Sequence, residues 1–480
     1  MKNNLTYHEV DFLLPAQRFN IAFSYITQKG LPFFREFILR LVHLSPMTKS
    51  QISVFLGLSQ REANEAISDL VERDELTLSD NNRLTLTDKA NGYFIDIGET
   101  PRLSTVRDSG AFLTFDLVTF TCLDRDITGD KWRLGFQIKT ENENTSNSEF
   151  LAGKAFQKQF YDILQKGLLA QSIALESRDQ PSVYTVNSVS KLRQLPVRLT
   201  VKLQMDSIGQ CVEREDFEML HDSEYIQEQI TLELSQFSRP NNLISIFQSM
   251  LELEDNKTLK VFDTKTNNIS LQYFDDLKKL EENRQFDRTS FLGPIYLEEN
   301  WSIFQKTLAP ILLSLIESKD DSYIPNFRWV APSDPFWGKN SRVSNCLSDL
   351  ISRSTTKNKK LYTPTIHLPI SSKNDIKAAR QWKYEFEPYA DQIKGIIEGL
   401  LGGNTEILLL EQRIAVVIYH VSLPATFPCT VPLGFLTTNS QYIEKIGKVV
   451  NRYLNDTANY KDTNDCGAIV ELVASDQQRS

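Results

Sequence analysis

Three polar residues in the first third of the chain lie at a spacing that could support metal-dependent chemistry. Asp116 lies in an apolar, strand-like run, AFLTFDLVTFTC, and Gln137 and Lys139 alternate along the next such run, RLGFQIKT. Carboxylate and amide oxygens are ligands that suit Mg²⁺, and a lysine ammonium can stabilise an attacking hydroxide or a developing negative charge. The three residues therefore predict a candidate catalytic site on two strands joined by a turn.

This arrangement resembles the PD-(D/E)xK class of restriction-type nucleases, in its glutamine variant. The resemblance implies that Asp116 and Gln137 hold Mg²⁺ and that Lys139 acts on the reacting charge. Two other triplets, 255–257 and 263–265, match the same short pattern, and an upstream acidic helix is not evident. The competing interpretation is a half-buried hairpin whose lysine extends to water.

A second candidate is the histidine near the end of the strand-like segment RIAVVIYHVSLP, His420. Phosphodiesterases of the phospholipase D class need His-x-Lys, whereas residue 422 is serine. The sequence therefore argues against an active enzyme of that class and leaves a degenerate copy of its fold open. For His420 and His367 we expect hydrogen-bonded strand histidines. A phosphate-binding loop, a Gly-x-Ser-x-Gly elbow and a His-Glu-x-x-His motif are all absent from the sequence.

Cysteines and histidines suggest neither a metal site nor a disulfide framework. The five cysteines are scattered and odd in number, and the five histidines show no metal-ligand spacing. We expect no metal and no cofactor, apart from the Mg²⁺ that the nuclease alternative would require.

The clearest structural pattern lies between residues 33 and 95. Apolar residues at helical spacing predict a helix from Phe33, a short helix capped by Thr48 and ended by Gly57, and a third helix after Ser59. Ser59 and the acid three residues later, Glu62, form the pattern of a capping box. The segments LTL and RLTL, joined by SDNN, predict a hairpin.

Helix, helix, turn, helix and hairpin in this order resemble the winged-helix family, through the segments FLGLSQREANEAISDLVERDEL and LTLSDNNRLTLTDKA. The resemblance implies a nucleic-acid-binding module whose third helix enters the major groove. Arg61, Arg83 and Lys89 would then contact nucleic acid.

The charges of the third helix favour a different partner. Its two basic side chains stand against four acidic ones, Glu62, Glu65, Asp69 and Glu72, which lie away from the apolar core. Acidic side chains repel phosphates and release no counterions. We therefore expect protein docking or self-association ahead of sequence-specific DNA binding.

Two later stretches could also contact a ligand. The segment FRWVAPSDPFWG, residues 327–338, could stack a base or dock a protein, but we favour the alternative that it folds back onto its own core. The segment SRSTTKNKKLY carries Lys357, Lys359 and Lys360 and no acid, so it is the best local nucleic-acid candidate. A solvated loop is the alternative.

Length and charge set the wider frame. The 480 residues carry 53 basic and 62 acidic side chains, a net charge of −9, which excludes a generally basic protein that coats nucleic acid. No export signal is visible, and the longest apolar run is too short to span a bilayer, so we expect a cytoplasmic protein without membrane contact.

We expect an α+β protein with an N-terminal winged helix followed by mixed α/β domains. The expected parts are an N-terminal arm, the winged helix, a mixed α/β middle region, a C-terminal α/β domain and a polar tail, at 1–30, 31–97, 98–320, 321–455 and 456–480.

The function that these patterns favour is a non-enzymatic recognition or scaffold component of a cytoplasmic multi-protein assembly. We expect protein partners and leave nucleic acid open as a second class. A winged helix ahead of a long α/β body is similar to accessory proteins of bacterial anti-phage defence systems, which implies a multi-subunit context. The alternative is the Mg²⁺-dependent nuclease.

Overall fold

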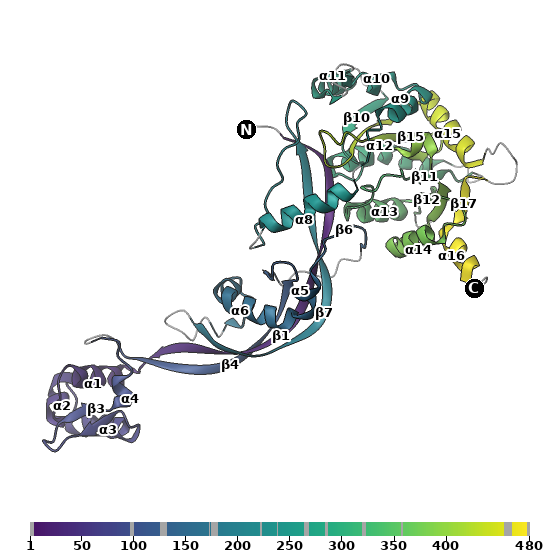
Figure 1. Cartoon of the computed structure of the whole chain (residues 1–480). Helices are drawn as coiled ribbons and strands as arrows, with labels where there is room; N and C mark the ends of the chain where they lie inside the picture. The colour runs from purple at the N-terminus through teal and green to yellow at the C-terminus, as the bar shows by residue number, and fades with distance from the viewer. Residues whose placement is uncertain are drawn as a thin grey trace. The chain divides into compact units, whose positions relative to one another are not determined.

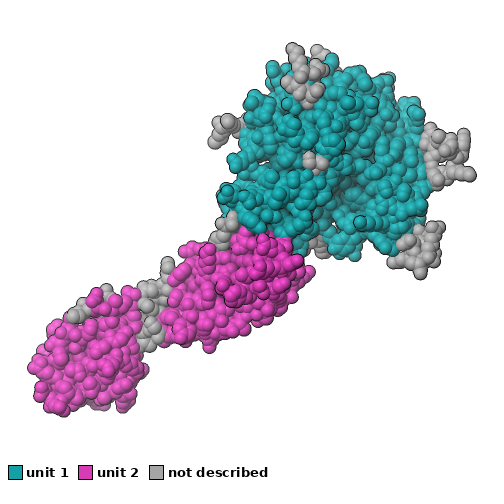
Figure 2. Space-filling view, viewed as in Figure 1, with its two compact units in different colours: residues 1–14, 128–139, 196–480 teal, residues 15–127, 140–195 magenta. Residues whose placement is uncertain are grey.

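The described residues of the computed structural model form both helices and strands in each part of the chain, which confirms the predicted α+β class (Figure 1). The chain divides into two compact units, one formed by residues 15–127 and 140–195 and the other by residues 1–14, 128–139 and 196–480 (Figure 2). The structure describes all residues except 1–3, 97–99, 125–131, 172, 174–180, 221–222, 238, 264–267, 284–286, 319–322, 357–358, 456–462 and 478–480. None of the helices within the described ranges is long and apolar enough to cross a membrane.

The smaller unit contains what we call the helical module, residues 33–94. Its elements follow the predicted order: α1 Phe33–Leu44, α2 Lys49–Leu56, α3 Gln60–Glu72, β2 Leu76–Leu78, β3 Leu84–Leu86 and α4 Asp88–Asn91. Both predicted helix starts are found, because the Thr48 hydroxyl accepts from the backbone N–H of Gln51 and the Ser59 hydroxyl accepts from that of Glu62. Gly57 ends α2 in the left-handed conformation. The assignment to the winged-helix family itself stays a prediction.

The rest of this unit is built on long strands, of which β1 and β7 also include residues of the larger unit. β1, Leu5–Gly30, pairs with β4, Arg102–Asp116, in antiparallel register from Ala16 opposite Asp116 to Gly30 opposite Arg102. β7, Ser182–Met205, also pairs with β1. The remaining elements are β5 Cys122–Leu123, α5 Asn142–Ser146 and α6 Ser148–Gln165. Aromatic side chains of α6 and the strands form the core, among them Phe19, Phe23, Phe115, Phe156 and Phe160.

Two expectations for this region need correction. The segment expected to be an N-terminal arm forms β1, and its buried residues Phe19, Ile21, Phe23 and Tyr25 show the period-two alternation of a half-buried strand. The two strand-like runs of the nuclease candidate do not pair with each other. β4 pairs with β1, and the short β6, Phe136–Gln137, pairs in parallel with β1 at another place, so β1 lies between them in the strand order.

The larger unit contains an eight-stranded sheet in the order β10-β16-β15-β14-β11-β12-β13-β17. β11, β12 and β13 are parallel, and the other neighbouring pairs are antiparallel. The strands are β10 Arg288–Leu292, β11 Asn326–Val330, β12 Thr363–Ile370, β13 Ile393–Ile397, β14 Thr405–Leu410, β15 Ile414–Val421, β16 Val431–Thr437 and β17 Asp465–Ala468. Every residue of β14, β15 and β16 is buried, which is typical of strands covered on both faces.

Helices supply the cover for this sheet. α12 and α13 contribute Trp301, Phe304, Leu308, Val343 and Leu347 to the same core as the strands. The helices of this unit are α8 Ser223–Gln236, α9 Leu243–Glu252, α10 Asn256–Leu259, α11 Leu271–Asn283, α12 Glu298–Glu317, α13 Arg342–Arg353, α14 Ile376–Glu385, α15 Ser440–Asn455 and α16 Ile469–Gln477. Two short 3-10 turns, Glu387–Tyr389 and Leu400–Gly403, and the strands β8 Phe262–Asp263 and β9 Asn268–Ile269 complete it.

The C-terminal third departs from expectation in two places. The apolar residues within 388–401, followed by Gly402 and Gly403 as a typical helix stop, predict a helix. The segment IKGII of this stretch instead forms β13, because a short β-branched run can form a buried parallel strand as well as a helix. The expected polar tail contains β17 and α16, and α16 is anchored by Ile469 and Val473, which are buried in the core of this unit.

Candidate functional site

The outer face of α3 is the first surface that could bind a partner. Ala63, Ile67 and Leu70 point into the module and are buried. The exposed side chains of the helix are Gln60, Arg61, Glu62, Asn64, Glu65, Ser68, Asp69, Val71 and Glu72. We call Arg61, Glu65, Asp69 and Glu72, with Arg73 after the helix, the α3 face.

One cation of the α3 face, Arg73, is paired with an acid of the same face. The guanidinium of Arg73 donates from Nε to Asp69 Oδ2 at 2.8 Å, and this hydrogen bond holds the pKa of Asp69 below its usual value. Glu62 is tied to the helix cap, and its hydrogen bonds from Ser59 hold its pKa low as well. The carboxylates of Asp69 and Glu62 are therefore held in their charged form at neutral pH.

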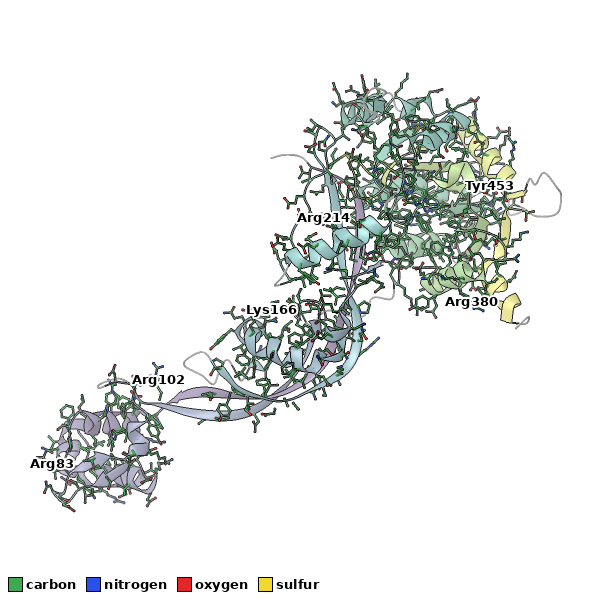
Figure 3. The ribbon with its side chains drawn as sticks, in the orientation of Figure 1. Arg83, Arg102, Lys166, Arg214, Arg380 and Tyr453 are labelled. Atoms are coloured by element: carbon green, nitrogen blue, oxygen red, sulfur yellow. The ribbon has the colours of Figure 1, made fainter. Side chains whose placement is uncertain are left out.

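The other basic residues predicted for this module lie on separate elements. Arg83 lies in the turn before β3, is exposed, and donates to the Pro46 carbonyl at 3.4 Å (Figure 3). Lys89 on α4 donates from Nζ to the Arg73 carbonyl at 2.6 Å, next to the end of α3. Arg61 lies on α3 itself. Lys89 therefore lies next to the end of α3, and no hydrogen bond or ion pair of the described residues joins Arg61, Arg83 and Lys89 to one another.

Asp116 and Lys139 both have structural partners. The buried carboxylate of Asp116 ends β4 by accepting hydrogen bonds from the backbone N–H of Val118 at 2.9 Å and of Thr121 at 2.7 Å. Lys139 Nζ pairs with Glu233 Oε1 at 3.1 Å. Asp116 belongs to the smaller unit, whereas the exposed Gln137 and Lys139 belong to the larger one. The nuclease assignment stays a prediction.

His420 lies at the centre of a buried ionic cluster that the sequence did not reveal. Its Nδ1 lies 2.7 Å from Asp334 Oδ2, and its Nε2 lies 3.0 Å from Glu406 Oε2. The other oxygen of Glu406 accepts from the indole N–H groups of Trp329 at 2.7 Å and Trp337 at 2.9 Å. All five side chains are buried.

The cluster holds a charged imidazole. Burial alone lowers the pKa of His420, but its hydrogen bonds to the two carboxylates outweigh burial and raise the pKa to about 9. Burial likewise tends to raise the pKa of Asp334, but the hydrogen bond from His420 prevails and the pKa is lowered. A protonated ring that donates from both nitrogens has no lone pair for nucleophilic attack or for a metal.

The predicted hydrogen-bonded strand histidine is thus confirmed for His420. The Nδ1 atom of His367, on β12, has no hydrogen-bond partner among the described residues, so the same prediction is wrong for that atom. One sequence signal could have pointed to the cluster: Glu406 is the single charged residue in the strand TEILLL.

A cleft of about 820 Å³ adjoins this cluster and is lined in part by Asp334. It lies where the parallel strands β11 and β12 end, a common place for ligands in open α/β sheets. Two of its cations are paired, Lys139 with Glu233 and Lys339 with Glu385. The aromatic segment 327–338 ends at this cleft, and its rings Phe327, Trp329, Phe336 and Trp337 are buried, which confirms that it folds back onto its own core.

The basic stretch before β12 borders a smaller groove. Lys357 lies outside the described residues, whereas Lys359 and Lys360 both line a groove of about 270 Å³. Lys359 Nζ donates to the Ser318 carbonyl at 2.6 Å. The groove also contains Arg413, which the sequence did not single out because it lies far along the chain. We call this site the basic groove.

Comparisons with known proteins give little further guidance. No family model matches the chain, and no curated protein matches it. Among solved structures, the chain is similar to TrmBL2, an archaeal chromatin protein whose structure is described as showing a novel mode of DNA binding. The identity is 11%, the match covers 49% of this chain and 69% of that chain, and the TM-score is 0.19. A TM-score this low carries no argument about the fold or function of this chain.

Proposed function

We propose that this chain is a non-enzymatic recognition protein and that its helical module is a winged helix that docks a protein partner with a basic surface. The observation that carries the proposal is the acidic, exposed α3 face. Glu65, Asp69 and Glu72 lie on the side of α3 that would meet a partner, while the apolar side packs into the module. Complementary charge steers association and suppresses wrong partners.

Duplex DNA fits this face poorly. Binding to DNA is driven largely by neutralising phosphates, and each carboxylate on the contact surface opposes that gain.

A protein partner also explains why two apolar side chains near the end of α2, the helix before α3, are exposed. Val54 is 82% exposed and Phe55 is 68% exposed. Exposed apolar residues beside a charged rim are typical of protein interfaces.

Co-purification from cells that naturally make the protein tests this proposal. The test variant is Glu65→Gln/Asp69→Asn/Glu72→Gln, which keeps side-chain size and removes three negative charges. The matched control is Asp275→Asn/Asp276→Asn/Glu282→Gln, three exposed acids on α11 in the other unit. We expect a protein that is recovered with the native chain and the control at constant ratio and is lost from the test variant. Equal recovery with all three chains would refute the proposal.

A DNA-binding experiment distinguishes protein docking by the helical module from DNA binding by the same module. Anisotropy of a labelled duplex is followed while salt is lowered, with the native chain and with Arg83→Glu/Lys89→Glu. We expect no binding that depends on these two residues. Duplex binding by the native chain that disappears in this variant would replace protein docking by DNA binding.

A further inference from the structure

The basic groove is assembled from four segments of the larger unit. The end of α12, the segment before β11, the segment before β12 and the turn between β14 and β15 all line it. These segments meet at the edge of the sheet where β11 and β12 begin, so the parallel pairing of those strands brings them together. The groove is therefore a product of the sheet topology and involves one unit only.

Positive charge is in excess in the groove. Its cations are Lys359, Lys360 and Arg413, and its one acid among the lining residues is Glu411. Lys360 and Arg413 are exposed, and their side chains make no hydrogen bond or ion pair with another described residue. Two cations are therefore open to a ligand.

The acid in the groove, Glu411, is ionised, and its negative charge is offset by partners within the protein. Glu411 pairs with Arg328 at 3.1 Å and accepts hydrogen bonds from the hydroxyl of Tyr323 at 2.5 Å and the backbone N–H of Asn326 at 3.0 Å. Burial tends to raise its pKa, but these hydrogen bonds prevail and lower it. The neighbouring segments outside the described residues, 319–322 and 357–358, carry two lysines and two aspartates, so they add no net charge.

An aromatic ring lies beside the cations. Tyr323 lines the groove and is 58% exposed, and its hydroxyl is held by Glu411, which fixes one end of the ring. Cations that hold phosphates beside an aromatic ring that stacks a base are the elements of single-strand recognition. A paired base offers no free face for stacking, and a groove of about 270 Å³ is too small for a duplex.

We propose that the basic groove binds single-stranded nucleic acid, with phosphates at Lys360 and Arg413 and a base stacked on Tyr323. This binding is separate from docking at the α3 face, and either could exist without the other. The shared chemistry of DNA and RNA, a phosphate beside an unpaired base, is what the groove recognises.

Fluorescence anisotropy of the full chain with labelled oligo(dT) and oligo(U) tests the proposal. We expect Lys360→Glu/Arg413→Glu to weaken binding at least tenfold and to reduce the salt slope by roughly 1.4, the value for two phosphates on a single strand. Lys306→Glu/Lys377→Glu, a pair of exposed lysines on α12 and α14, is the matched control and should leave binding within twofold. The two oligonucleotides show whether the groove prefers DNA or RNA.

The ring of Tyr323 is tested separately. Tyr323→Ala should weaken binding roughly tenfold, and Tyr323→Phe, which keeps the ring and loses the hydrogen bond to Glu411, should retain most of the affinity. Circular dichroism spectra that match the native spectrum show that the variants are folded. The Glu65→Gln/Asp69→Asn/Glu72→Gln variant should bind the oligonucleotides like the native chain, so loss of protein docking and loss of nucleic-acid binding are distinguishable.

Three results would overturn the inference. The first is absence of binding to both oligonucleotides at low salt. The second is equal affinity of the native chain and the groove variants. The third is salt-sensitive self-association, without oligonucleotide binding, that disappears in both Lys360→Glu/Arg413→Glu and the α3-face variant, because the groove would then receive the α3 face of a second copy.

Discussion

Two ends of the same strand pair use charge in opposite ways. At one end of β14 and β15, His420, Asp334 and Glu406 are buried and bonded to one another. At the other end, the turn that joins these strands contributes Arg413 to a groove where it and Lys360 are exposed and without such partners among the described residues. Buried, paired charges belong to the stability of the sheet, whereas exposed, unpaired charges are available to a ligand.

The α3 face extends this comparison to a surface of opposite sign. There a cation, Arg73, is occupied by Asp69, and the surplus is negative. In the basic groove an acid, Glu411, is occupied by Arg328, and the surplus is positive. The net charge of −9 describes neither surface. Local pairing decides which charges remain for a partner.

The largest effect is expected from His420→Gln. Loss of the imidazolium leaves two buried carboxylates without their shared cation, and breaking a buried pair in this way costs about 3–5 kcal/mol of unfolding free energy. Urea unfolding followed by tryptophan fluorescence measures it, because Trp329 and Trp337 bond to Glu406. The matched control is His367→Gln, a buried strand histidine without a carboxylate hydrogen bond. Equal losses in the two variants would contradict a special role for the cluster.

A pH dependence of similar origin should follow. The pKa of His420 is raised in the folded chain from 6.5 to about 9, so its stabilisation is complete below pH 6.5 and is lost as the pH rises through about 9. The unfolding free energy should therefore fall by roughly 3 kcal/mol across this window. Unfolding curves for the native chain and His420→Gln at both ends of the window measure the difference. A decline of the same size in His420→Gln would assign it to other groups.

Variants of the basic groove should lose ligand binding and keep their stability, in contrast to His420→Gln. Lys360→Glu/Arg413→Glu changes exposed side chains that have no hydrogen-bond or ion-pair partner among the described residues, so its unfolding free energy should stay within about 0.5 kcal/mol of the native value while oligonucleotide binding weakens at least tenfold. The same urea titration gives the measurement. A loss comparable to that of His420→Gln would mean that these charges are structural.

A small effect on the unfolding free energy is expected from Lys139→Ala. This lysine pairs with Glu233 but is 69% exposed in its side chain, and a screened pair of this kind contributes less than about 1 kcal/mol. We also expect the native chain to leave plasmid DNA intact in Mg²⁺ or Mn²⁺. Cleavage by the native chain that Lys139→Ala abolishes would restore the nuclease alternative.

Local signals in the sequence predicted local structure. The caps at Thr48 and Ser59, the turn at Gly57 and the hairpin after α3 depend on neighbouring residues, and all four are found. β1 could have been predicted from its alternating apolar residues. The helix expected in place of β13 shows the limit, since its few apolar residues become a strand only through pairing with β12 and β17.

The sites depended on contacts between distant residues. His420 meets Asp334 and Glu406 across separations of 86 and 14 residues, and no spacing rule connects them. Lys359 and Lys360 were visible as a basic stretch, but Arg413 joins them only because of the strand order in the sheet. The acidic α3 face was predictable, because one helix carries all of its acidic residues.

Hydrogen–deuterium exchange of the chain with its co-purified partner tests docking at the α3 face most directly. We expect slower exchange over residues 60–72 in the complex than in the free chain, with no such change for the Glu65→Gln/Asp69→Asn/Glu72→Gln variant mixed with the same partner. Unchanged exchange over residues 60–72 in a stable complex would contradict docking at this face.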